Sequence, residues 1–145
     1  MAAYAACAWS LAFAAVHIYW ALGGTLGLPP GMSVVANPAL FVIDVVAVPL
    51  CVVAALLALS FVRPWGRAFP RRLLLVSGWG VCAILLFHSA PTLARGILVA
   101  AGLLDADLSV LDRWSLTVYE PWFFLGGLLY GAAALLYGRG SPRPF

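Results

Sequence analysis

Four apolar stretches dominate this chain, and each is long enough to cross the hydrocarbon core of a membrane. A helix rises about 1.5 Å per residue, so about twenty residues span a core of roughly 30 Å. Of the 145 residues, 65% are hydrophobic and 9% are charged, which is too little polar surface for a water-soluble domain. The sequence therefore predicts an all-α integral membrane protein with a single four-span domain. The predicted spans are residues 3–22, 38–62, 73–93 and 115–137.

Turn and capping residues set the predicted ends of these spans. Asn37 followed by Pro38 is a strong helix start, because a capping side chain precedes a proline at the first helical position. Residues 96–111 are apolar but interrupted by Asp105 and Asp107, so we expect an interfacial helix or a lid there. The default arrangement of four such spans is an up-and-down four-helix bundle.

Small residues in the third and fourth spans predict close contacts between helices. Gly127 and Gly131 have the G-x-x-x-G spacing that lets helix backbones approach, and Ser77, Gly78 and Gly80 offer a similar surface. We interpret these positions as packing positions.

The arginines predict the topology. All eight basic residues are Arg: four lie within residues 63–72, Arg139 and Arg143 follow the fourth span, and Arg95 and Arg113 lie on the opposite side. The positive-inside rule then places both termini in the cytoplasm of a multi-pass plasma-membrane protein. Because the arginines flank spans, the partner they indicate is the lipid bilayer, and no nucleic-acid partner is expected.

Each predicted span carries one ionisable residue that is costly to bury without a partner: His17, Asp44, His88 and Glu120. Counted from the predicted span ends, each lies about 7 to 9 Å below the outer surface. An isolated charge in a span costs roughly 2.5 to 3.5 kcal/mol on insertion scales, so mutual pairing is favoured. We predict a shared site in the outer half of the bundle. Glu120 has an alternative role, as the cap of a helix that starts at Pro121.

Aromatic residues cluster around these four positions. The aromatic belt at a membrane interface accounts for some of them. Core packing is the alternative for a set that recurs at helical spacing: Trp9, Phe13, His17 and Trp20. The same spacing also places rings along one face of a cavity. The predicted substrate-binding residues are Phe13, Tyr19, Trp20, Phe41, Tyr119, Trp122 and Phe123.

These residues suit an enzyme that transfers protons to a lipid-soluble, isoprenoid-like substrate without a cofactor. Asp44, the preferred acid, or Glu120 donates a proton to an alkene or epoxide, ring faces stabilise the cation, and His17 or His88 accepts the final proton. The layout resembles, by analogy, that of integral-membrane terpene cyclases, which place acidic residues in an aromatic pocket of a small helical bundle. That analogy implies a cyclase or an epoxide-opening isomerase.

Two other functions remain open. His17 and His88 suit haem iron, or a divalent metal together with the carboxylates, although the Glu-x-x-His and C-x-x-C-H spacings are missing. A non-catalytic accessory subunit, in which the polar residues only set helix register, is the third hypothesis. The sequence gives no indication of the oligomeric state.

Residues 17–24, His-Ile-Tyr-Trp-Ala-Leu-Gly-Gly, together with the four-span length and the Arg-rich middle loop, resemble a family of small bacterial membrane proteins of unknown function. The resemblance implies the four-span topology and a bacterial plasma-membrane location. It implies no reaction.

Overall fold

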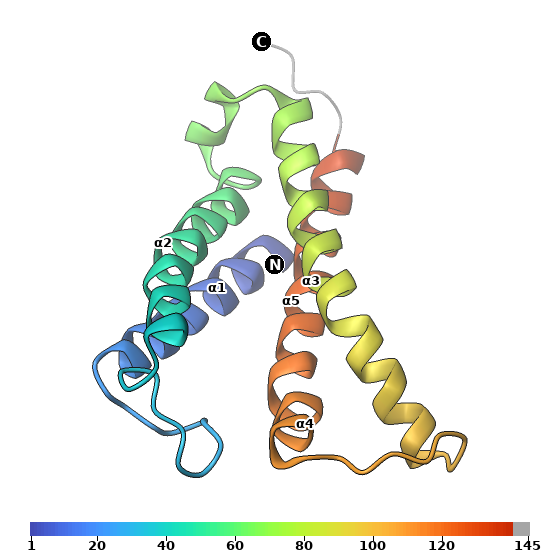
Figure 1. Ribbon diagram of the computed structural model, residues 1–145. Helices are drawn as coiled ribbons and strands as arrows, with labels where there is room; N and C mark the ends of the chain where they lie inside the picture. The colour runs from blue at the N-terminus through green and yellow to red at the C-terminus, as the bar shows by residue number, and fades with distance from the viewer. Residues whose placement is uncertain (141–145) are drawn as a thin grey trace.

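The computed structural model describes residues 1–140, and within them it contains helices and no strands. Four helical stretches are long and apolar enough to cross a membrane, which confirms the predicted fold class. Arg143, used above for the topology, lies outside the described residues. The helices are α1 (Ala2–Ala21), α2 (Pro38–Ser60), the 3-10 helix η1 (Pro64–Ala68), α3 (Arg71–Ala100), α4 (Val110–Trp114), the π-helical turn η2 (Ser115–Tyr119) and α5 (Glu120–Arg139) (Figure 1).

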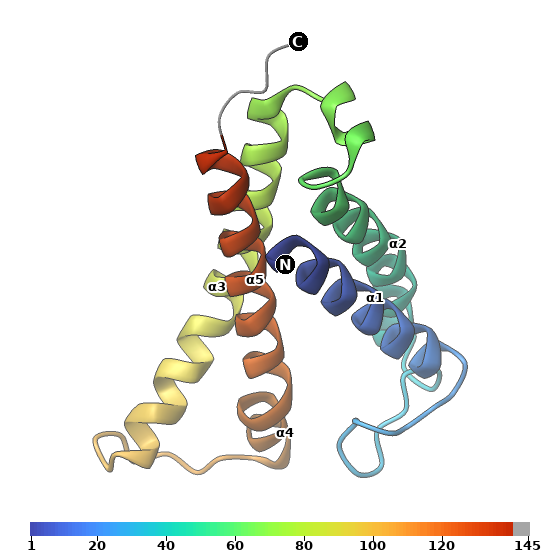
Figure 2. The same cartoon turned by 180° about the vertical axis from the view of Figure 1, so that it is seen from behind.

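The helices form two closely packed pairs. α1 packs along α2 and α3 packs along α5, whereas α2 and α3 make few contacts. The two pairs meet where α1 crosses α5, and Figure 2 shows the N-terminal end of α1 beside α5. The loops formed by residues 22–37 and 101–109 lie at one end of the molecule, and residues 61–70 lie at the other (Figure 1).

Aromatic rings fill the crossing between α1 and α5. Trp9 stacks on Trp122 with ring centroids 5.6 Å apart and donates a hydrogen bond of 3.1 Å to the Trp122 carbonyl. Nearby, the hydroxyls of Ser10 and Tyr130 are 2.7 Å apart and fully buried. A Cβ on Gly126 would collide with the Trp9 ring, so glycine is needed for the close approach. The core therefore sits at this crossing.

The first two spans match the predictions within two residues, but the predicted end of the third span is wrong. α3 continues through Pro91 to Ala100, well beyond residue 93. A proline removes only one backbone hydrogen bond, and in an apolar environment helix remains the conformation that satisfies the other backbone groups. α3 ends at Ala100, and Gly102, two residues later, has a φ of 69° that suits the turn after a helix C-terminus. The interfacial helix predicted for residues 96–111 is therefore also wrong, since α3 takes its first part and residues 101–109 are irregular, and the alternative of a lid stays a prediction.

The predicted start of the fourth span is wrong as well, because the final helix begins at Val110 and runs continuously to Arg139. A capping box starts it: the Ser109 Oγ accepts from the Asp112 N–H at 3.1 Å, and the Asp112 Oδ2 accepts from the Ser109 N–H at 2.9 Å. Glu120 consequently lies inside a continuous helix and does not cap its start.

The G-x-x-x-G prediction is confirmed. A Cβ on Gly127 would lie 2.7 Å from the Leu86 side chain, and one on Gly131 would lie 2.9 Å from the Cys82 Sγ, so both glycines allow α5 to approach α3. Gly80 is different, because a Cβ there would have nothing within 4 Å. The predicted packing role of Gly80 is therefore wrong.

These glycines give a matched test of packing. We expect Gly127→Ala and Gly131→Ala each to lower the free energy of unfolding by about 1 to 2 kcal/mol, because the added methyl group overpacks the contact between α3 and α5. Gly80→Ala should be neutral or stabilise by up to about 1 kcal/mol, since alanine is the better helix former. Circular dichroism during denaturation in mixed micelles measures all three. Equal stabilities would contradict the packing role.

Candidate functional site

The four ionisable span residues form two pairs, each between neighbouring helices. His17 Nδ1 of α1 lies 2.7 Å from Asp44 Oδ1 of α2, and His88 Nε2 of α3 lies 3.9 Å from Glu120 Oε2 of α5. His17, Asp44 and Glu120 are buried, whereas the His88 side chain is 56% exposed. A buried ionisable group in a span is tolerated when such a partner is present.

The predicted distances of His88 and Glu120 from their span ends are wrong, because the third helix ends later and the final helix begins earlier than predicted. His88 and Glu120 lie about three turns from the ends of their helices, as α3 extends to Ala100 and the final helix starts at Val110. His17 and Asp44 lie within about two turns of the ends of theirs. The two pairs thus differ in their distance from the helix ends, and a shared layer for the four residues stays a prediction.

The start of α2 determines where Asp44 lies. The Asn37 side chain accepts hydrogen bonds from two backbone N–H groups of the first turn, with Pro38 at the first helical position, as predicted. Asp44 then faces His17, and at 2.7 Å a proton on either atom bridges the pair. The Asp44 Oδ2 is buried and has no hydrogen-bond partner within residues 1–140. Phe41 lies one turn earlier and is 38% exposed.

A π-helical turn precedes Glu120. Pro121 has no N–H, so it leaves the Thr117 carbonyl without its usual partner, and η2 accommodates this with the Glu120 N–H bonded to the Ser115 carbonyl. The Ser115 hydroxyl donates to Glu120 Oε1 at 3.0 Å. The other oxygen, Oε2, is buried and makes no hydrogen bond to the described residues. One carboxyl oxygen of Glu120 therefore accepts a hydrogen bond, and the other accepts none within residues 1–140.

Aromatic rings connect the two pairs. The Phe13 centroid lies 4.4 Å from that of His17 and 5.4 Å from that of Phe123, which in turn lies 4.7 Å from that of His88. Trp122 lies 6.3 Å from Phe13, and its buried Nε1 has no hydrogen-bond partner in the described part of the chain. Three of the predicted substrate-binding residues thus lie between or beside the pairs.

Three other residues from that prediction hold the loop of residues 22–37 against the helix ends. Trp20 Nε1 donates to the Leu26 carbonyl at 2.8 Å, and the Tyr119 hydroxyl donates to the Gly27 carbonyl at 2.8 Å. The Tyr19 hydroxyl accepts from the Leu26 N–H at 3.4 Å. Their polar atoms are therefore engaged by backbone groups of this loop.

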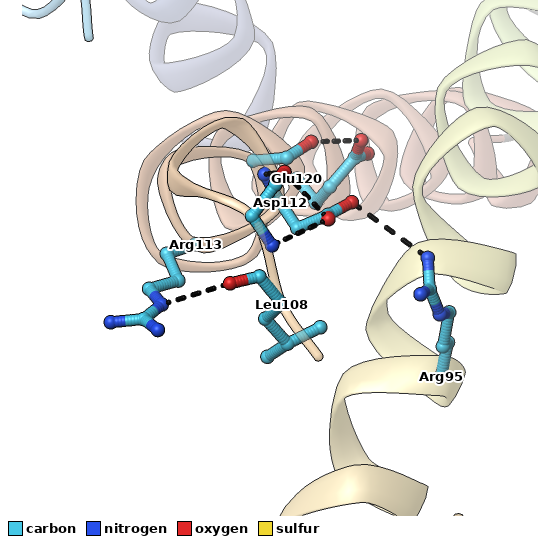
Figure 3. Close-up of polar contacts among 7 residues, drawn as sticks. Arg95, Leu108, Asp112, Arg113 and Glu120 are labelled. Atoms are coloured by element: carbon cyan, nitrogen blue, oxygen red, sulfur yellow. Dashed lines mark hydrogen bonds and ion pairs between the residues drawn. The ribbon is translucent and has the colours of Figure 1, made fainter. Parts of the chain in front are cut away.

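A cavity of about 330 Å³ lies beside Glu120, between α3 and the start of the final helix. Ser115, which donates to Glu120, forms part of its wall. Arg95 Nη1 and Asp112 Oδ1 lie 3.7 Å apart (Figure 3). The lining residues are Pro91, Thr92, Arg95, Leu111, Asp112 and Ser115.

Sequence reasoning missed Arg95, Asp112 and Ser115 as site residues. The sequence signal for them is the Ser109 capping box, which starts the final helix early enough to place Asp112 and Ser115 on one of its faces.

The described part of the chain gives no support for a metal site of three or more ligands. No three His, Cys, Asp or Glu residues within residues 1–140 are grouped as such a site requires. Binding of haem or a metal through His17 and His88 stays a prediction.

Comparison with known proteins identifies the family. One family model, described as a protein of unknown function, matches residues 10–130, a range that includes both pairs and the cavity. Neither the curated proteins nor the solved structures contain a match. The chain therefore belongs to the family of proteins of unknown function designated DUF3995.

Proposed function

We propose that this protein is an intramembrane enzyme that moves protons to and from a lipid-soluble, isoprenoid-like substrate. The observation that carries the proposal is the environment of Glu120, a buried carboxyl with one free oxygen that lies 3.9 Å from an exposed imidazole. Acid–base catalysis needs a positioned proton donor and a group that restores its proton. Glu120 is the donor in this proposal, and His88 is the group that restores its proton.

Glu120 replaces Asp44, the acid preferred from the sequence, for a structural reason. Asp44 and His17 are bonded to each other at 2.7 Å, and both side chains are less than 10% exposed. Glu120 is bonded to Ser115, which lines a cavity. We assign the closed pair a positioning role, since it joins α1 to α2 and holds His17 against the Phe13 ring.

The proposed reaction is an isomerisation or cyclisation. The Glu120 proton goes to an alkene carbon or an epoxide oxygen, and a cation forms on the substrate. The faces of Phe13, Phe123 and Trp122 stabilise that cation. The substrate then loses a proton to His88, which returns it to Glu120. One proton is added and one is removed, so the reaction consumes neither oxidant nor reductant, and no cofactor belongs to the proposal.

A structural role is the second possibility, and the His17–Asp44 pair is the observation that favours it. A buried hydrogen-bonded pair between two helices can set their register without any chemistry. Conservative substitution of Glu120 separates the two roles, because it removes the proton and keeps the contact.

We expect Glu120→Gln to fold normally, since the amide oxygen still accepts from Ser115, and to lower turnover by about 10² to 10⁴, the usual contribution of a general acid. The assay incubates the protein in nanodiscs with a panel of polyene and epoxidised isoprenoids in D₂O and measures deuterated products by mass spectrometry.

The matched control for this variant is Asp107→Asn, which changes an exposed carboxyl in the loop of residues 101–109 and should leave turnover unchanged. Wild-type turnover and deuterium incorporation in Glu120→Gln would refute the acid role of this residue.

We also propose that both termini lie in the cytoplasm of a bacterial plasma membrane and that the cavity lies near the outer face. The positive-inside rule supports this. One end of the molecule holds the start of α3 and the end of α5, and the described arginines there are Arg63, Arg67, Arg71, Arg72 and Arg139. The opposite end holds Arg95 and Arg113, together with Asp105, Asp107 and Asp112.

Cysteine labelling tests this topology in a background without the native cysteines. A membrane-impermeant maleimide should label Asp105→Cys in intact cells, because that loop faces outward, and should label Arg67→Cys only after lysis. The reverse pattern would contradict the proposed orientation.

A further inference from the structure

We propose that the cavity between α3 and the start of the final helix binds an uncharged oxygen-bearing head group of the substrate, such as an alcohol, epoxide or carbonyl. Ser115 relays the proton between that head group and Glu120. The inference rests on the proposed function of Glu120 and adds the class of substrate on which it acts.

Each wall of the cavity is a single helix face. The residues from α3 are Pro91, Thr92 and Arg95, and those from the final helix are Leu111, Asp112 and Ser115. Both sets have the spacing i, i+1, i+4, so in each wall the first and last residues lie on one face. The volume of about 330 Å³ is at the lower end for small-molecule sites, which suits a head group whose apolar chain extends into lipid.

The cavity lining holds one positive and one negative side chain, Arg95 and Asp112. Figure 3 shows Arg95 reaching from α3 toward Asp112, and the 3.7 Å between Arg95 Nη1 and Asp112 Oδ1 exceeds a hydrogen-bond distance. Ser109 holds Asp112 in place, because its N–H and hydroxyl donate to Asp112 Oδ2 at 2.9 and 2.7 Å. Arg113, the neighbouring cation, donates to the Leu108 carbonyl and is outside the lining.

This balance selects against charged head groups. A carboxylate or phosphate held by Arg95 would lie against Asp112, and an amine held by Asp112 would lie against Arg95. An uncharged oxygen accepts from the Arg95 guanidinium without such repulsion, and a hydroxyl also donates to Asp112. The lining therefore favours an alcohol, an epoxide or a carbonyl.

Ser115 connects the cavity to Glu120. Its hydroxyl is in the cavity wall and donates to Glu120 Oε1 at 3.0 Å. A hydroxyl can donate on one side while it accepts on the other. When the Ser115 hydroxyl turns to the head-group oxygen and passes its proton to it, Ser115 takes a proton from Glu120 Oε1, and His88 later returns one to Glu120.

Photocrosslinking of the full-length protein in nanodiscs of zwitterionic lipid tests the head-group class. Three probes carry the same hexadecyl chain with a diazirine next to the head, which is an alcohol, a carboxylic acid or an amine. We expect the alcohol to label peptides containing residues 91–95 and 111–115 about tenfold more than either charged probe. Equal labelling by a charged probe would overturn the inference.

Charge variants sharpen this test. Asp112→Asn keeps a side-chain oxygen that accepts from Ser109 and leaves the positive charge of Arg95 without its neighbouring carboxylate, so labelling should shift toward the carboxylic acid probe. Arg95→Gln should shift labelling toward the amine probe. The controls, Asp107→Asn and Arg113→Gln, remove the same charges outside the cavity and should leave the order of the probes unchanged. Equal shifts in a variant and its control would assign the effect to surface charge and overturn the inference.

The proton relay through Ser115 is tested by the kcat and KM of Ser115 variants. Ser115→Ala should lower kcat about tenfold or more with KM unchanged, because the head group still binds while its proton path is lost, and Ser115→Thr should restore kcat because it keeps the hydroxyl. Unchanged kcat in Ser115→Ala would overturn the relay.

Labelling tests the head-group site, and turnover of Glu120→Gln tests the acid role of Glu120, so the two proposals can fail separately. Glu120→Gln keeps the lining intact, so labelling by the alcohol should stay within about twofold of the wild type. Selective labelling together with full turnover of Glu120→Gln would retain the head-group site and reject the acid. Unselective labelling together with lost turnover would do the opposite.

Discussion

A carboxyl group inside an apolar helix needs a partner, and both carboxyls that are buried in these spans have an imidazole on a neighbouring helix. Asp44 pairs with His17, and Glu120 lies near His88. Removing one partner of a buried pair leaves an uncompensated polar group and typically costs about 3 to 5 kcal/mol. The buried His17–Asp44 pair therefore constrains how α1 sits against α2. The difference in exposure between the two pairs separates a closed pair from an open one, and the proposed proton transfer is assigned to the open pair.

The crossing of α1 and α5 joins these two pairs into one assembly. Trp9 stacks on Trp122 at this crossing, and the Phe13 and Phe123 rings meet edge to face beside it. Because Phe13 and Phe123 also contact one imidazole each, the packing that holds the helix pairs together also forms the surroundings of the site. Rings at this position suit both close packing and the stabilisation of a nearby cation.

Local signals in the sequence predict much of the fold but only part of the site. Asn37 predicts the start of α2 because capping is a local property, whereas Pro91 is misleading since its effect depends on the apolar surroundings of the helix. The capping box of Ser109 is also a local signal, and it starts the final helix earlier than the predicted fourth span. Single ionisable residues in apolar stretches indicated that partners exist, but the choice of partner depends on tertiary packing. Ser115 gave no signal, because an isolated hydroxyl is common in helices.

A double-mutant cycle on His17 and Asp44 tests most directly the claim that acid–imidazole pairs join the helices. The free energy of unfolding is measured in mixed micelles for the wild type, His17→Ala, Asp44→Ala and the double variant. We predict that each single change costs about 3 to 5 kcal/mol and that the double change costs less than their sum by about 1 to 3 kcal/mol. Additive effects, with no coupling between the two positions, would contradict the account.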